Sequence, residues 1–166
     1  MRKYLLGIGA ALLLFLVACQ SESKEVIDFH NGYIDNVDAK LEEVDEQTEI
    51  IYNGDPSDEE AEEAADKLES LGNEMVEYLE DQDPEQEDTK EYKALRLEFA
   101  KLYKESIDLD VEWVRGVLEG SIDDNDVEEL MNASYEKYEE ASDKFDEAEE
   151  KLDELSDEYG LEEIEE

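Results

Sequence analysis

The sequence predicts an all-α protein, specifically an antiparallel up-down four-helix bundle. Apolar residues recur at intervals of three and four through four long segments, which is the period of a helix and not of a strand. No proline interrupts the interior of these segments, and the connections between them are short, which favours antiparallel neighbours. The four helices are expected at residues 24–52, 58–80, 84–119 and 122–159.

The first two connections contain residues that end and restart helices. Asn53-Gly54-Asp55-Pro56 reads as a turn, because Asn and Gly tolerate positive φ and Pro blocks helix continuation. Ser57-Asp58-Glu59-Glu60 then forms a capping box for the second helix. At the next break, Asp83 is expected to cap the third helix and Pro84 to occupy its first position.

The third connection and the end of the fourth helix also contain residues that end or restart helices. Gly120 suits the residue after a helix end, Ser121 is expected to cap the fourth helix, and Gly160 ends it before the acidic tail 161–166. The third and fourth helices are expected to be longer than the first two. At about 1.5 Å per residue, their shared tip would project beyond the second helix by about 20 Å. The favoured interpretation is nevertheless that the first two helices pack lower or higher than this simple layout and bury the apolar cluster of the tip as core.

Residues 1–18 have the three parts of a secretory signal. Arg2 and Lys3 supply a positive start, residues 5–17 are uncharged and apolar, and a small Ala18 follows. The apolar run is shorter than the ~20 residues that a membrane-spanning helix requires. The sequence therefore predicts export rather than a transmembrane segment.

The residues Leu16, Val17, Ala18 and Cys19 resemble the lipobox of bacterial lipoproteins. The resemblance implies a diacylglyceryl group on the Cys19 sulfur and cleavage before this residue. Two acyl chains hold a protein at a membrane because each buried methylene contributes roughly 0.8 kcal/mol. Residues 19–23 would then be a lipidated tether, and residues 24–160 a helical domain on the outer face of the cell membrane. An ordinary signal peptide is the alternative.

The overall layout of signal, lipobox and acidic helical domain is similar to small helical lipoproteins of Gram-positive bacteria. Some of these are labelled cell-wall-binding, and their functions are unknown. The similarity is one of layout, and no motif after Cys19 carries it. It therefore assigns no binding role to any residue of the helical domain.

The charge of the chain restricts its partners. It has 54 acidic and 14 basic residues and a net charge of −40 at pH 7. Such a chain repels nucleic acid and anionic headgroups, so no nucleic-acid partner is expected. Salt screens the repulsion among these charges, so the composition suggests adaptation to high salt. A disordered chain at low salt is the alternative to a folded bundle.

Calcium is the obvious cation for so acidic a chain. The acidic runs 81–85 and 123–129 lack the glycine and the final glutamate of an EF-hand loop. Neither run is therefore expected to bind the ion tightly, and a diffuse cloud of counterions is the better account.

Catalytic chemistry has little support in the sequence. His30 is the one histidine and lies on an apolar stripe, while the one thiol, Cys19, is assigned to the lipid. No glycine-rich phosphate loop accompanies them. The sequence predicts neither an enzyme nor a cofactor, and assigns no catalytic, cofactor-binding or metal-ligating residue.

A possible partner site lies at the tip of the third and fourth helices. Apolar residues gather there, and exposed apolar patches often bind partners. The residues of this patch are Trp113, Val114, Val117, Leu118, Ile122, Leu130 and Met131.

Tyrosines are also frequent on or beside the apolar stripes. They could bind sugars, although a tyrosine at the edge of a bundle more often buries its ring and leaves its hydroxyl wet. The sequence thus favours a non-enzymatic, membrane-anchored helical module of the cell envelope that binds a protein or acts as a spacer. The alternative is a lipoprotein that binds a cell-wall fragment, a small apolar ligand or Ca²⁺.

Overall fold

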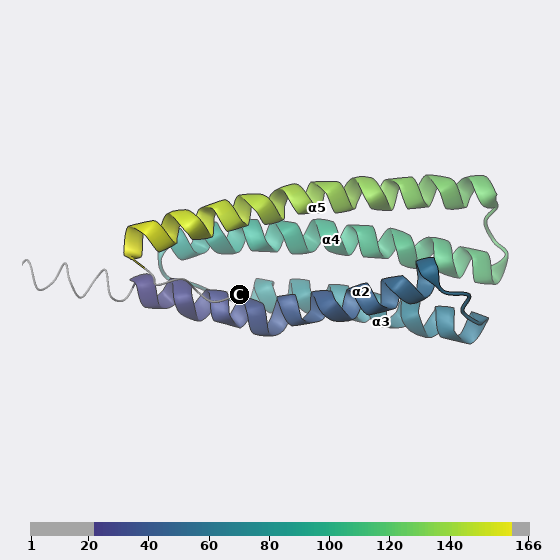
Figure 1. Ribbon diagram of the computed structural model, residues 1–166, viewed down its shortest axis with the longest axis horizontal. Coiled ribbons are helices and arrows are strands. Elements are labelled where there is room, and N and C mark those ends of the chain that lie inside the picture. Colours follow the sequence, from purple (N-terminus) through teal and green to yellow (C-terminus); the bar gives the residue numbers. More distant parts are fainter. Residues whose placement is uncertain (1–21, 161–166) are drawn as a thin grey trace, which may run out of the picture.

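The computed structural model describes residues 22–160, which form a long antiparallel bundle of helices (Figure 1). Residues 22–33 are helical and run directly into the π-helical segment η1 (Ile34–Asp38) and helix α2 (Ala39–Asn53). The later helices are α3 (Asp58–Asp81), α4 (Glu87–Glu119) and α5 (Asp124–Tyr159). No strand occurs within residues 22–160. The predicted four-helix bundle, with its longer third and fourth helices, is confirmed.

The four helices do not contact one another equally. Helix α4 packs along both α3 and α5, and α2 packs along α3, whereas α2 and α5 scarcely meet. Figure 1 shows α5 beside α4, with α2 in front of α3. The backbones of α2 and α5 are therefore not closely packed on the side of the bundle that these two helices share.

Three of the predicted helix ends are confirmed in detail. The Ser57 hydroxyl accepts a hydrogen bond from the Glu60 backbone N–H, and the Glu60 carboxylate accepts one from the Ser57 N–H at 2.9 Å. Gly120 and Gly160 each end a helix in the left-handed conformation, with φ of 66° and 61°. Gly54, by contrast, is extended, and its lack of a side chain matters because a Cβ there would lie 2.5 Å from the Ile50 carbonyl oxygen.

The predicted start of the third helix was wrong by three residues. Helix α4 begins at Glu87 with Gln86 as its N-cap, instead of at Pro84 after a capping Asp83. The Glu25 carboxylate accepts hydrogen bonds from the backbone N–H groups of Glu85 and Gln86. These bonds tie the residues before α4 to the helix at 22–33.

The predicted cap of the fourth helix was also wrong. The N-cap is Asp123, whose carboxylate accepts from the N–H groups of Asn125 and Asp126, and the Asp126 carboxylate accepts from the Asp123 N–H. The Ser121 hydroxyl instead donates to the Gly116 carbonyl, at the end of α4. The Asp123 carboxylate thus caps α5 and is not a free ligand for a cation.

The extra length of α4 lies at the end opposite to the one predicted. Lys101 of α4 pairs with Glu80, next to the last residue of α3, so residues 87–100 of α4 extend past the end of α3. At the other end Arg115 pairs with Glu62 in the first turns of α3. The α4–α5 tip is therefore level with α3 and does not project by 20 Å.

The core runs the length of the bundle. Its fully buried side chains come from all four helical segments, and the largest apolar and aromatic ones are Val26, Tyr33, Val37, Val44, Leu68, Leu71, Met75, Leu79, Tyr92 and Leu155. Helix α5 contributes small residues, Ala141 and Ala148, at two of its buried positions. Within residues 22–160, no helix combines the length and the apolar character needed to cross a membrane.

The difference between the predicted and the observed cap of α5 is testable. Replacing Asp123 with alanine removes the acceptor of two backbone N–H groups, and we expect the thermal midpoint to fall by roughly 2–4 °C. The matched change Ser121→Ala should lower it by less than half as much. Thermal denaturation followed by circular dichroism checks both, and equal effects would contradict the assignment of the cap.

Candidate functional site

The predicted lipidation site lies outside the described residues. This holds for Cys19, for the preceding Leu16, Val17 and Ala18, for the signal at 1–18 and for the acidic tail 161–166. Both the first and the last described residues lie at one end of the bundle, and the α2–α3 and α4–α5 connections lie at the other (Figure 1). Lipidation of Cys19 stays a prediction, and it would attach the membrane at the first of these ends.

The predicted partner patch is divided among several environments. Val114 is buried, Trp113 and Leu118 are partly buried, and Val117 is half exposed. These four residues line a shallow hollow of about 210 Å³ together with Ile51 of α2, Pro56 of the α2–α3 connection, and Asp58 and Ala61 of α3. The first two helices therefore cover much of this part of the patch.

The remaining members of the patch face elsewhere. Ile122 packs directly over Gly116, where a Cβ would lie 2.6 Å from its Cδ1. Leu130 is partly buried, and Met131 is 37 % exposed on α5, where it lines a different hollow. The seven residues do not form one continuous apolar surface.

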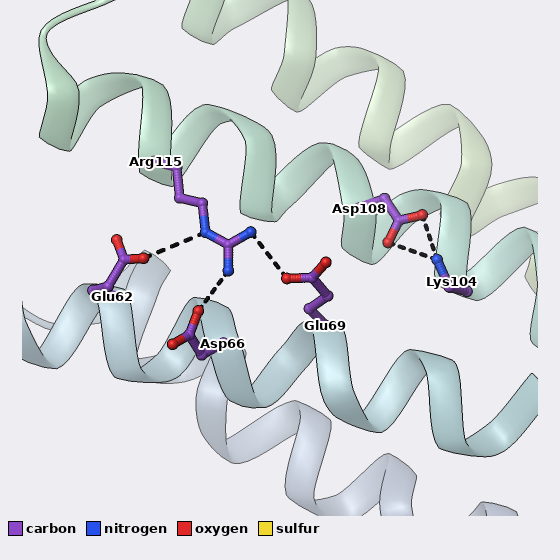
Figure 2. Close-up of polar contacts among 6 residues, drawn as sticks. All are labelled: Glu62, Asp66, Glu69, Lys104, Asp108 and Arg115. Atoms are coloured by element: carbon purple, nitrogen blue, oxygen red, sulfur yellow. Dashed lines mark hydrogen bonds and ion pairs between the residues drawn. The ribbon is translucent and has the colours of Figure 1, made fainter.

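Arg115, the cation within this patch, is held by the neighbouring helix. Its guanidinium contacts three carboxylates along α3, with nitrogen–oxygen distances of 3.4 Å to Glu62, 2.5 Å to Asp66 and 2.9 Å to Glu69 (Figure 2). Nearby on α4, Lys104 pairs with Asp108 within its own helix (Figure 2). Arg115 thus joins α4 to α3 and is not free for a partner.

An opening with aromatic walls lies between α2 and α5, over α4. It consists of a hollow of about 410 Å³ and a second of about 210 Å³, and Tyr138 lines both. We call this opening the tyrosine groove. Its main lining residues are Leu41, Tyr52, Phe99, Tyr103, Asp110, Met131, Ser134, Tyr135, Tyr138 and Phe145.

The walls of the tyrosine groove expose aromatic surface that a closed bundle would bury. Tyr135 is 59 % exposed and Tyr138 is 50 % exposed, although Tyr138 falls on the apolar stripe of α5. The rings of Tyr103 and Tyr138 face each other across the α4–α5 boundary with centroids 6.1 Å apart. At the other end of the groove, Tyr52 of α2 meets Trp113 edge to face at 5.7 Å.

The floor of the tyrosine groove holds a buried carboxylate. Asp110 is 8 % exposed, and its Oδ1 accepts a hydrogen bond of 2.6 Å from the Tyr52 hydroxyl and a longer one from the Trp113 indole. Burial raises the pKa of Asp110 above its ordinary value, and hydrogen bonds from Tyr52, Ser134 and Trp113 oppose part of that rise. None of the ion pairs within residues 22–160 involves Asp110.

A second buried polar cluster, the Arg96 cluster, lies nearer the other end of the bundle. Arg96 is 1 % exposed, its guanidinium lies 4.2 Å from the Tyr33 ring centroid, and it forms an ion pair with Glu149 of α5. Its Nε–H donates to the Tyr92 hydroxyl at 3.0 Å, and that hydroxyl is also hydrogen-bonded to His30 Nδ1 at 2.8 Å.

The protonation of this cluster follows from its geometry. Since Arg96 can only donate, the Tyr92 hydrogen is free to reach His30 Nδ1, which then acts as an acceptor on a neutral ring. Burial and then the charge of Arg96 lower the pKa of His30, in agreement with that state. Burial raises the pKa of Tyr92 to about 12. His30 is thus a core residue, as its place on the apolar stripe predicted.

The π-helical segment shapes the same cluster. A π turn adds one residue to the helix and often marks a functional site. Here it leaves Tyr33 and Val37 buried and brings Asp38 beside the cluster, where burial raises the pKa of Asp38. Among residues 22–160, Tyr33 Oη, Asp38 Oδ1 and Arg96 Nη1 are buried without a hydrogen-bond partner of normal geometry. These atoms are buried within the bundle, so the cluster is part of the core.

Sequence analysis missed both Arg96 and Asp110, yet a signal for them exists. Both occupy a row spaced by four and three along α4, and six of its eight positions are aromatic, apolar or serine. The row is Tyr92, Arg96, Phe99, Tyr103, Ser106, Asp110, Trp113 and Val117. A charged residue at such a position faces the interior, which is where the structure places these two.

The comparisons with known proteins assign no family. No protein-family model, no curated protein and no solved structure matches this chain. Within residues 22–160, no group of three or more His, Cys, Asp or Glu side chains is arranged to hold a metal ion.

The raised pKa of Asp110 predicts how its replacement changes stability with pH. A carboxyl whose pKa is higher in the folded state favours folding when protonated, so its penalty grows as the pH rises above about 4. We therefore expect Asp110→Asn to leave the thermal midpoint nearly unchanged near pH 3.5 and to raise it at pH 7.

The matched variant Glu112→Gln removes one exposed charge from the same helix and corrects for the general relief of repulsion. The rise for Asp110→Asn at pH 7 should exceed the rise for Glu112→Gln. A fall in the midpoint at pH 7 would contradict the description of Asp110 as a carboxylate that costs stability.

The Arg96 cluster predicts that removing the charge of Glu149, unlike that of Asp110, lowers the stability of the fold. Replacing Glu149 with glutamine removes the opposite charge from a buried guanidinium, but nearly half of the Glu149 side chain is in water, so we expect a loss of about 1–2 kcal/mol in the free energy of unfolding. The neighbouring change Glu150→Gln, at an exposed position, is the control and should cost little. Urea denaturation measures both, and equal losses would show that the pair contributes nothing specific.

Proposed function

We propose that this chain is a lipid-anchored, non-enzymatic binding module of the cell envelope that offers the tyrosine groove to a protein partner. The single observation that carries the proposal is the unpacked side of the bundle between α2 and α5. A spacer needs no such opening, because exposed aromatic surface costs solubility and provides no rigidity. A binding site, by contrast, typically gathers tyrosine and methionine in a partly desolvated hollow.

The position of the tyrosine groove fits an anchored protein. Tyr52 lies one residue before the last residue of α2, at the end of the bundle with the helix connections, while residue 22 lies at the other end (Figure 1). If Cys19 carries the lipid, the larger hollow of the groove faces away from the membrane. A partner in the envelope could then reach it without contacting the bilayer.

The anchor itself is tested by replacing the cysteine. Cells that express the full chain and are fed an alkyne-tagged fatty acid should label the wild-type protein, and Cys19→Ser should abolish the label and release the protein from the membrane fraction. The control is Ser23→Ala, a nearby change that should alter neither the fatty-acid label nor the retention in the membrane fraction. Retention of the label in Cys19→Ser would remove the anchor from the proposal.

The binding role is tested with a photocrosslinking amino acid placed in living cells. At position 138, on the wall of the tyrosine groove, illumination should yield a discrete adduct of higher mass. At position 73, an exposed site on α3, it should not. Absence of an adduct from both 138 and 135, or equal adducts from 73, would overturn the assignment of the groove.

A further inference from the structure

The unpaired carboxylate of Asp110 indicates what the tyrosine groove selects. A buried charge without an opposite charge is costly, so proteins normally pair it within the fold. Asp110 instead has three neutral donors, the Tyr52 and Ser134 hydroxyls and the Trp113 indole. The fold thus holds an acid at the floor of an open hollow and leaves its charge uncompensated.

The described part of the chain has no cation placed to supply this compensation. Between residues 22 and 160, every lysine and arginine except Lys93 is paired with a carboxylate, and Lys93 donates to the backbone carbonyls of Glu80 and Gln82. The two cations of α5 closest in sequence to the groove wall, Lys137 and Lys144, pair with Glu105 and Glu98 of α4. A cation that pairs with Asp110 is therefore expected to come from another molecule.

The walls above Asp110 suit a cation with an apolar stem. The faces of tyrosine rings attract ammonium and guanidinium groups, and the stem of a lysine or arginine packs on the same rings. The Arg96 cluster shows this chemistry inside the same protein. There a guanidinium lies 4.2 to 5.1 Å from three aromatic ring centroids and pairs with one carboxylate.

The shape and charge of the tyrosine groove favour a length of chain over a small cation. Along α2 the groove extends from Leu41 to Tyr52, which is about 16 Å at the rise of a helix. Its rim is acidic, since the exposed Asp45 lines it and Glu139 hydrogen-bonds Tyr135. With a net charge of −40, the protein draws a positively charged segment toward itself over a long range.

We propose that the tyrosine groove binds a basic segment of a partner protein and that one lysine or arginine side chain of this segment pairs with Asp110. The inference rests on the proposed function and specifies the chemistry of its partner. Apolar side chains of the segment lie along Tyr138, Tyr103 and Phe145, and the remaining basic side chains lie along the acidic rim.

The test uses a defined probe and the one tryptophan of the chain. The probe is a short fluorescein-labelled amphipathic peptide made of leucine and lysine, and a twin peptide has every lysine replaced by glutamine. Binding to the lipid-free mature protein is measured by fluorescence anisotropy at physiological ionic strength, where charges beyond about 8 Å are screened. In a parallel titration with unlabelled peptide, Trp113 emission reports whether the probe enters the groove beside Asp110.

We expect the lysine peptide to bind and to shift Trp113 emission. Asp110→Asn should weaken its binding about tenfold, equivalent to about 1.4 kcal/mol, whereas Glu112→Gln should change it less than twofold. The glutamine peptide should bind the wild-type protein weakly. Tyr138→Ala, at a half-exposed position where folding is not at risk, should also weaken the binding of the lysine peptide.

Three results would overturn the inference. The first is no binding of the lysine peptide to the wild-type protein. The second is an equal loss in Asp110→Asn and Glu112→Gln, which would show a general attraction to negative charge. The third is that n-butylamine or n-butylguanidinium, at the same concentration, occupies the groove as well as the peptide does and depends equally on Asp110. A groove that still crosslinks a partner in cells under any of these results would keep the proposed function and lose this inference alone.

Discussion

Two charges in the inward-facing row of α4 determine how this bundle is built. Arg96 and Asp110 occupy positions that packing normally gives to apolar residues, and a bundle must either compensate such charges or leave them near water. Arg96 is compensated, by Glu149 and by three aromatic rings. Asp110 is not, and the bundle is open above it. The closed end of the bundle, around Arg96, and its open side, above Asp110, thus show opposite ways of accommodating an inward-facing charge.

The composition of the neighbouring helices reinforces this division. At the closed end, the helix at 22–33 supplies Phe29, His30 and Tyr33 against α4, and the π-helical segment brings Asp38 beside the guanidinium. Along the open side, α2 and α5 scarcely touch, and the tyrosines between them keep their rings partly in water. Most of the cations serve to hold helices together within an acidic surface, as Arg115 does across α3 (Figure 2).

The sequence was sufficient for the fold because its signals were local. Spacings of three and four predicted the helices, and Ser57, Gly120 and Gly160 marked their ends correctly. The errors came from contacts between distant residues. Glu25 binds the backbone of the residues before α4, and the register set by Lys101 and Glu80 moves the extra length of α4 away from the tip. No local pattern encodes the π-helical segment or the failure of α2 and α5 to meet, so the tyrosine groove could not be predicted.

The account depends on the tyrosine groove being open in the isolated protein. Chemical nitration tests this most directly, because the nine tyrosines of the chain differ in exposure. Applied to the folded protein at neutral pH and read by mass spectrometry, the reagent should modify Tyr135 and Tyr138 readily. It should spare the fully buried Tyr33 and Tyr92. Protection of Tyr135 and Tyr138 to the same degree as Tyr33 would show that α2 and α5 close over the groove, and would contradict the account.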